Sequence, residues 1–255
     1  SGDRSTVQSR DFKVTFLDRN RVRGDAQTAQ PLTVTVLPGV SLIGSNPDVT
    51  TIALGLVVAE AYRVEGGMLS PIVGIAQEDM IGVQLSGVGN VVGGDLTGYQ
   101  NAGVFNVVSG NSFAFQNAGV FNHVEGTGGL VQISGVFNIA SAGFNGIQSA
   151  GVFNMTDGPL NGVQIGGVYN QAGPANGAQI SLVNVAGNVN GAQIGLVNVG
   201  QRVVGTQIGL VNISEEMYGV PIGLATFVER GIHDVSVWWE GEERTWLGVQ
   251  NGSNI

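Results

Sequence analysis

Few side chains in this sequence could carry out acid–base or nucleophilic chemistry. The chain has no cysteine, which excludes a thiolate nucleophile, a disulfide and a cysteine-ligated zinc site. Its two histidines are His123 and His233. His123 takes a repeated position that Val107 and Ile139 fill in other repeats, so we interpret it as a tolerated substitution. His233 precedes Asp234, but adjacent residues on a strand point to opposite faces, which argues against a His–Asp pair.

Paired acids could serve glycoside cleavage, which needs two carboxyl groups beside the sugar bond. The candidates are Glu78-Asp79, Glu215-Glu216 and Glu242-Glu243. We interpret all of them as solvated charges in turns or in the C-terminal segment. Gly93-Gly94-Asp95 resembles one turn of a calcium-binding repeat array, but it occurs only once. The sequence therefore predicts no catalytic residue, no metal site and no cofactor.

Composition and charge narrow the class of protein further. Of the 255 residues 42 are glycine, yet 43% are hydrophobic and only 11% are charged, which is typical of a folded chain. The formal net charge is −9 and most cations precede residue 24, so we expect no nucleic-acid partner. No uncharged apolar run of about 18–20 residues is present, so we predict no transmembrane helix.

A repeat dominates the chain between residues 43 and 228. Its clearest mark is an asparagine that recurs every 16 residues and then, in the C-terminal part, every 14 residues. The asparagines in register are Asn90, Asn106, Asn122, Asn138, Asn154, Asn170, Asn184, Asn198 and Asn212. A glutamine lies six residues before the asparagine in the long repeats and five before it in the short ones. Repeats this short cannot hold two helices, and their β-branched, glycine-rich composition predicts two short strands each.

These repeats predict an all-β protein, a parallel β-solenoid of about twelve coils of 16 and then 14 residues. We expect an N-terminal strand cap with an Arg-rich loop over 1–42, the solenoid over 43–228 and a C-terminal hairpin cap over 229–255. Glycine before the glutamine, as in Asn161-Gly162, is expected to take positive φ, although Ala114 and Leu130 depart from this pattern.

The recurrence of asparagine at one repeat position distinguishes a transmembrane β-barrel from a β-solenoid. In a transmembrane β-barrel, successive strands alternate in direction, so the same residue in every strand brings no benefit. In a solenoid, each residue stacks on its copy about every 4.8 Å, and side-chain amides can form a continuous hydrogen-bonded ladder. We therefore favour the solenoid and predict an asparagine ladder within it.

Two apolar rows precede the asparagines. The first comprises Phe105, Phe121, Phe137, Phe153 and Tyr169, with valine in the shorter repeats. The second comprises Val104, Val120, Val136, Val152, Val168, Leu182, Leu196 and Leu210. We predict that the aromatic row points into the coils, because its large residues coincide with the long repeats. The aliphatic row is then either exposed, as a surface for association, or buried by a bend at the corner.

Two repeat motifs carry a family resemblance. They are Asn-Gly-Ala-Gln-Ile-Gly-Leu-Val-Asn-Val (190–199) and Gln-Asn-Ala-Gly-Val-Phe-Asn-Val-Val (100–108). Both are similar to motifs of the bacterial surface-repeat proteins described from leptospires and Bacteroidetes, and the resemblance covers residues 35–235. It implies a protein of the cell surface, outer membrane or periplasm whose leader peptide has been removed, and it brings no catalytic residues.

We expect a non-catalytic surface or envelope β-solenoid that acts as a rigid scaffold or adhesin. Its expected partner is a second copy of the chain or another envelope protein, and the sequence names no small-molecule ligand. The alternatives are a carbohydrate-active β-helix enzyme, either a lyase or a hydrolase, and a transmembrane β-barrel.

Overall fold

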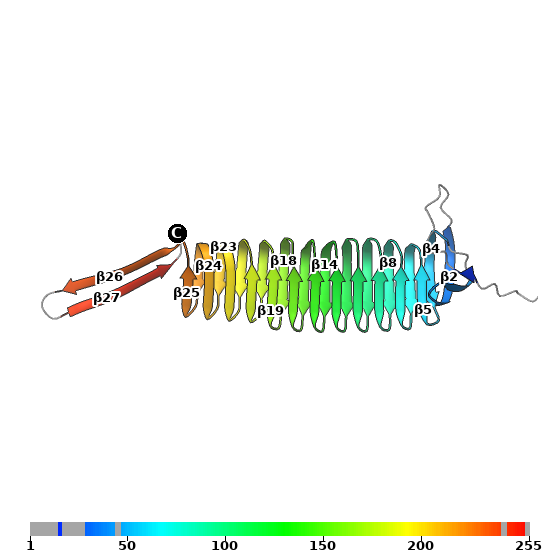
Figure 1. Ribbon diagram of the computed structural model, residues 1–255, viewed down its shortest axis with the longest axis horizontal. Coiled ribbons are helices and arrows are strands. Elements are labelled where there is room, and N and C mark those ends of the chain that lie inside the picture. Colours follow the sequence, from blue (N-terminus) through cyan, green and yellow to red (C-terminus); the bar gives the residue numbers. More distant parts are fainter. Residues whose placement is uncertain (1–14, 17–28, 44–46, 241–243, 253–255) are drawn as a thin grey trace, which may run out of the picture.

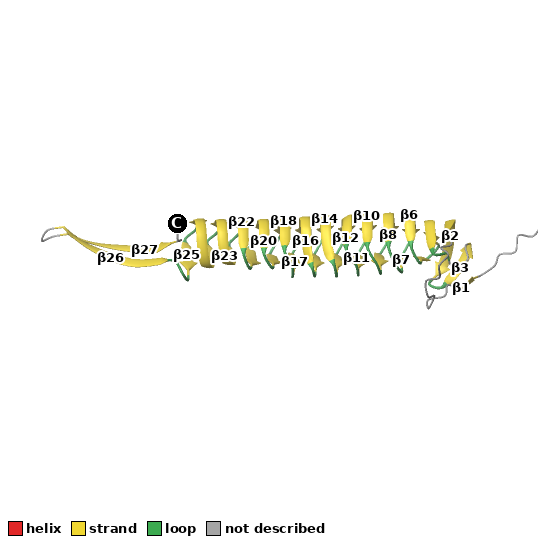
Figure 2. Ribbon diagram, turned by 90° about the horizontal axis from the view of Figure 1, so that it is seen from above, coloured by secondary structure: helices red, strands yellow, loops and turns green. Residues whose placement is uncertain are grey.

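Each repeat forms one coil of a parallel β-solenoid, and the coils stack into a straight rod (Figure 1). This computed structural model describes residues 15–16, 29–43, 47–240 and 244–252. A coil consists of a long strand, a tight corner, a short strand and a turn that leads to the next coil. Figure 2 shows the same rod from above, with its strands stacked along the length. Every regular element among the described residues is a strand, and the predicted all-β parallel solenoid is confirmed.

The coils contribute two layers of strands. The long strands are β4 (Val49–Gly55), β6 (Val64–Ser70), β8 (Met80–Ser86), β10 (Leu96–Ala102), β12 (Ser112–Ala118), β14 (Thr127–Ser134), β16 (Gly143–Ala150), β18 (Leu160–Gly166), β20 (Ala175–Ile180) and β22 (Val189–Ile194). The short strands are β5 (Val58–Ala61), β7 (Val73–Ala76), β9 (Gly89–Val92), β11 (Phe105–Val108), β13 (Phe121–Val124), β15 (Phe137–Ala140), β17 (Phe153–Thr156), β19 (Tyr169–Ala172), β21 (Val183–Ala186) and β25 (Ala225–Val228). In the last full coils the turn is so short that β23 (Val197–Ile208) and β24 (Val211–Ile222) run through both layers.

Parallel pairing places identical residues on top of one another. β10 lies beside β8 with Gln100 opposite Gln84. The same register continues across the change from 16 to 14 residues, where β19 pairs with β21 and Asn170 lies opposite Asn184. The shortening therefore occurs in the connections and leaves the stacked positions aligned, as the sequence spacing predicts.

A bend of two residues at the corner decides which side chains lie inside. β10 ends at Ala102, and β11 begins at Phe105, so Gly103 and Val104 turn the chain. Ala102 and Asn106 are buried, whereas Val104 is exposed and Phe105 is half-buried. Because the bend interrupts strand alternation, Val104 and Phe105 both face outward although they are adjacent. The prediction that the aromatic row points into the coils is wrong, and the asparagine row takes that place.

The predicted glycine position at the start of the glutamine segment has the expected backbone. Gly146 and Gly162 have φ of 136° and 145°. A Cβ atom on Gly162 would collide with the carbonyl oxygen of Gly146 in the preceding coil, so close approach also requires glycine. Leu130 occupies the equivalent place at φ 69°, the one positive φ of a non-glycine residue in the described part of the chain.

The two ends of the solenoid contain antiparallel strands. β2 (Ala29–Leu37) pairs in parallel with β4 and antiparallel with β3 (Val40–Ile43), which also pairs with β1 (Thr15–Phe16). The expected Arg-rich loop falls at 17–28, outside the described residues. β26 (Ile232–Glu240) and β27 (Arg244–Gly252) form a separate antiparallel pair, drawn beyond the last coil in Figure 1.

Candidate functional site: amide ladders inside and an apolar stripe outside

The nine asparagines form a continuous hydrogen-bonded ladder inside the short-strand layer. Each is fully buried, and in all but Asn212, the last, Nδ2 donates to the Oδ1 of the asparagine in the following coil over 2.8–3.1 Å. At mid-ladder, Asn138 accepts from Asn122 and donates to Asn154, both at 2.9 Å. Its second amide hydrogen reaches the backbone carbonyl of Ser149 at 2.9 Å. The predicted asparagine ladder is therefore present, and every member binds both side chain and backbone.

The glutamines form a second ladder that sequence reasoning missed. Gln148 Nε2 donates to Gln132 Oε1 at 2.8 Å, and the same bond recurs from Gln84 to Gln207. All of these glutamines are fully buried. In the sequence analysis, the regular spacing of these glutamines indicates only the register of the repeat. Identity at a second stacked position was the signal that could have predicted this ladder.

The two ladders run in opposite directions. Asparagine amides donate toward the C-terminal end of the rod, whereas glutamine amides donate toward the N-terminal end. At their donor ends, Asn212 and Gln84 each donate to a backbone carbonyl at 3.0 Å, of Ile222 and Gly74 respectively. At their acceptor ends, Asn90 Oδ1 and Gln207 Oε1 are buried acceptors without a hydrogen-bond partner among the described residues. Because the amide dipoles oppose one another, the interior carries little net dipole along its axis.

Buried amides are stable here only because their partners repeat in register. An unpaired buried polar group costs about 1–3 kcal/mol, so an amide inside the rod requires a matching amide in the next coil. Small apolar residues such as Ala102, Val108 and Ala140 occupy the buried positions beside the ladders. Larger apolar side chains such as Leu96 and Phe144 are buried at other positions of the coils.

The aromatic row forms a stack on the outer face of the short strands. Successive rings from Phe105 to Phe153 have centroids 4.9–5.6 Å apart and nearly parallel planes. His123 lies one position past the ladder asparagine, half-buried and in register with Val107 and Ile139. The predicted row containing His123 is therefore confirmed, and it belongs to this outer face.

The predicted aliphatic row is exposed along the corner of the rod. We call this row of eight residues, from Val104 to Leu210, the apolar stripe. Six of its members are exposed, from 37% at Val104 to 49% at Leu210, and Val120 and Val136 are half-buried. Backbone hydrogen bonds extend the same row to Ile72 and Val88 at one end and to Leu224 at the other. Of the two outcomes expected for this row, the exposed one is correct.

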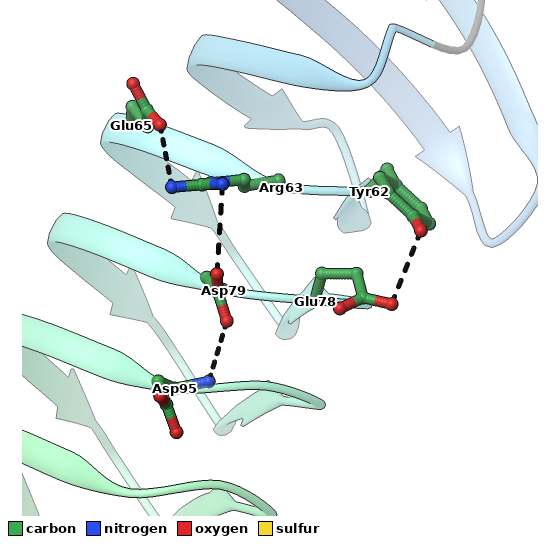
Figure 3. A network of polar contacts seen from close by, with 6 residues as sticks. All are labelled: Tyr62, Arg63, Glu65, Glu78, Asp79 and Asp95. Atoms are coloured by element: carbon green, nitrogen blue, oxygen red, sulfur yellow. Dashed lines mark hydrogen bonds and ion pairs between the residues drawn. The ribbon is translucent and has the colours of Figure 1, made fainter. Parts of the chain in front are cut away.

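Charged side chains lie on the opposite edge, where the turns join one coil to the next. Figure 3 shows part of this edge near the N-terminal end of the rod. Asp79 Oδ1 accepts from the backbone N–H of Asp95 at 3.0 Å, and Asp79 Oδ2 lies 3.9 Å from Arg63. The hydroxyl of Tyr62 donates to Glu78 at 3.3 Å. These carboxylates join neighbouring turns to one another.

The acidic pair Glu215-Glu216 also lies at a turn. Arg230 donates to Glu216 at 2.9 Å, and this hydrogen bond raises the pKa of the Arg230 guanidinium. Arg202 lies 3.7 Å from the other oxygen of Glu216. The side chain of His233 and the pair Glu242-Glu243 lie outside the described residues. In the described part of the chain, no three His, Cys, Asp or Glu side chains gather as a metal would require.

Fold and surface together define a β-solenoid repeat protein with an amide core and an apolar outer stripe. Comparison with protein-family models, with curated proteins and with solved structures finds no match to this chain. None of the described residues forms a helix with the length and hydrophobicity needed to cross a membrane.

Proposed function

We propose that this protein is a non-catalytic scaffold or adhesin of a bacterial cell surface or envelope. The observation that carries the proposal is the apolar stripe, exposed along successive coils at the corner of the rod. Exposed apolar patches on monomeric proteins rarely exceed a few hundred Å², and larger ones mark interaction sites. A continuous row of this length is costly to leave in water, so we infer that a partner covers it.

The interior supports a role as a rigid spacer. Two opposed ladders tie every coil to the next through buried side-chain hydrogen bonds, in addition to the backbone pairing. A rod held in this way keeps the members of the stripe at a fixed spacing of about 4.8 Å. Such a surface suits repeated contacts with an extended partner.

The proposed location rests on the family resemblance of the repeat motifs. We place the protein at the cell surface, in the outer membrane or in the periplasm. Fractionation of cells that express the full-length gene tests this placement, and recovery in the cytosol would contradict it.

The experiment for the proposed function removes the apolar character of the stripe while keeping its shape. The variant replaces Val120, Val136 and Val152 with threonine, which retains the β-branched form of valine. The matched control places threonine at Val131, Ile147 and Val163, which lie in adjacent coils on the outer long-strand face. We expect the stripe variant to lose association with itself and with purified envelope proteins, and the control to retain it. Circular dichroism and thermal melting verify that both variants fold.

Three outcomes would contradict the proposed function. The first is a wild-type protein that stays monomeric at high concentration and binds no envelope protein. The second is a control variant that loses binding as fully as the stripe variant. The third is cleavage of any member of a glycan panel, because catalytic turnover would place the protein in the enzyme class.

A further inference from the structure

We infer that the stripe is covered by the stripe of a second copy of this chain, packed side by side in an antiparallel dimer with two-fold symmetry. This inference rests on the proposed function, because it names the partner of the same surface. Four observations support it: the area of the surface, the distribution of charge, the gradient of side-chain size and a groove beside the row.

The surface has the area that a stable dimer needs. The corner row and its flanking outward positions span about four residues, or about 13 Å, and the ten coils from Ile72 to Leu210 extend about 48 Å. The product, about 620 Å², lies at the lower end of the roughly 600–1,000 Å² that each partner buries in a standard interface. A shorter overlap would bury too little, so the two rods must overlap along nearly the whole row.

Charge is separated from the stripe. Between Met80 and Leu224, the charged residues are Asp95, Glu125, Asp157, Arg202, Glu215 and Glu216, and all lie at the turn edge opposite the corner. Interface cores are depleted of charge, and two acidic molecules can meet through this corner with their carboxylates held apart. A membrane surface is less suitable, because lipid-facing elements carry Lys or Arg and Trp at their margins. This segment contains no Lys and no Trp.

The size of the stripe residues changes along the rod. Valine occupies the row in the 16-residue coils and leucine in the 14-residue coils. In a parallel pair, leucine would meet leucine and valine would meet valine, so the two rods would diverge at one end. In an antiparallel pair that overlaps from Ile72 to Leu210, Leu182 meets Val104 and Leu196 meets Val88, which keeps the separation of the rods more even than leucine on leucine would. Leu210 meets Ile72 at the end of the row. Equal patches on both copies are the rule for two-fold dimers.

A groove beside the leucines can receive the partner's row. It is a shallow groove of about 460 Å³, lined by an isoleucine row, the leucine row and the glycines between them in the chain, such as Gly195 and Gly209. Ile194 and Ile208 form one wall, and Leu196 and Leu210 form the other. Because both rods have the same repeat of about 4.8 Å, successive side chains of the partner can enter this groove in step.

Overlap of the ten members from Ile72 to Leu210, with Leu224 beyond the end of the partner's row, fixes the facing residues. The two-fold axis then passes between Val136 and Val152, so Val104 of one copy faces Leu182 of the other. Since the chain has no cysteine of its own, single cysteine variants report this geometry directly. A disulfide forms only when the two Cα atoms lie about 4.4–6.8 Å apart.

The test uses Val104→Cys and Leu182→Cys, oxidised separately and as a mixture, with Ile147→Cys as a control outside the stripe. We expect wild-type protein to have twice the molar mass of one chain in light scattering. The mixture should give a cross-linked pair that contains one chain of each variant, and each variant alone should stay uncross-linked. Mutual cross-linking of Val104→Cys alone would overturn the antiparallel dimer in favour of a parallel one.

Further outcomes separate this inference from the proposed function. A wild-type monomer that binds a purified envelope protein through the stripe would overturn the second-copy inference and leave the proposed function standing. A monomer that binds phosphatidylethanolamine–phosphatidylglycerol vesicles in a flotation assay, and no longer binds them when Val120, Val136 and Val152 are replaced, would overturn the second-copy inference. The stripe would then be a lipid-binding surface. A monomer whose behaviour is unchanged by that replacement would overturn both proposals.

Discussion

The inner and outer surfaces of this solenoid follow different rules. At the ladder position on the short strand, nine successive coils carry asparagine. One residue earlier, eight of these coils carry Phe, Tyr or Val on the outside, and Gly89 takes this position in the first. Inside, a change of residue would leave a buried amide without its partner. Outside, apolar residues can replace one another, as at a contact surface. Identity therefore marks the ladder positions of this rod, whereas apolar character alone marks its outer rows and its remaining buried positions, such as Leu96 and Phe144.

The strongest way to break this comparison is to place a charge in the ladder. Asn138→Asp removes the donor to Asn154 and to the Ser149 carbonyl, and leaves a buried carboxylate. We expect a loss of about 3–5 kcal/mol at neutral pH, measured by denaturant unfolding. Burial raises the pKa of the introduced carboxyl in the folded state above its unfolded value of about 3.9, so the loss should shrink toward acid pH and grow as pH rises.

The matched control makes the same change outside. Asn161 is exposed, donates to Asn145 and accepts from Asn176 in an outward row at the turn edge. Asn161→Asp should change the unfolding free energy by less than about 0.5 kcal/mol. Equal losses for the two variants would show that the asparagine ladder is not buried.

Two phenylalanines in adjacent segments compare inside with outside directly. Phe144 is fully buried against the Gly128 backbone, whereas Phe137 lies half-buried in the outer aromatic stack. Phe144→Ala should cost about 3–4 kcal/mol because it leaves a cavity. Phe137→Ala should cost about 1–2 kcal/mol, from partial burial and lost ring stacking. A larger loss of stability for Phe137→Ala than for Phe144→Ala, in thermal or denaturant melts, would indicate that the aromatic row lies in the interior.

The cost of losing a ladder asparagine should depend on its position along the ladder. Asn138→Ala leaves Asn122 without an acceptor and Asn154 without a donor. Asn212→Ala removes the acceptor of one ladder neighbour only, Asn198. We therefore expect Asn138→Ala to cost more than Asn212→Ala, by about 1–3 kcal/mol in denaturant melts. Equal and negligible losses would count against a cooperative interior ladder.

The smallest effect concerns backbone strain. Leu130 takes φ 69°, where the neighbouring coil has Gly146. Left-handed backbone costs a non-glycine residue about 1–2 kcal/mol, so Leu130→Gly should raise stability by up to about 1 kcal/mol despite its lost apolar contact. A lower melting temperature for this variant would mean that the exposed Leu130 side chain contributes more than the strain costs.

Much of this architecture was predictable because stacking rewards identity. Asn90 through Asn212 defined the register, the two strands of each coil and the site of the deletion that shortens the later coils. The orientation of the rows was not predictable, because a two-residue bend such as Gly103-Val104 breaks the alternation that assigns faces. The expectation that Phe105 lies inside followed ordinary burial preferences, which the amide ladder reverses on this strand. The same bend prevents the sequence from predicting whether Val104 is exposed.

The central claim is that two buried amide ladders hold an apolar-coated rod together. Hydrogen exchange of the side-chain carboxamides, followed by NMR, tests it most directly. The account predicts slow exchange for the ladder asparagines and glutamines, such as Asn138 and Gln132, and fast exchange for outward residues such as Asn145 and Asn161. Fast exchange of the Asn138 and Gln132 carboxamides in the folded protein, at the rate of Asn161, would contradict it.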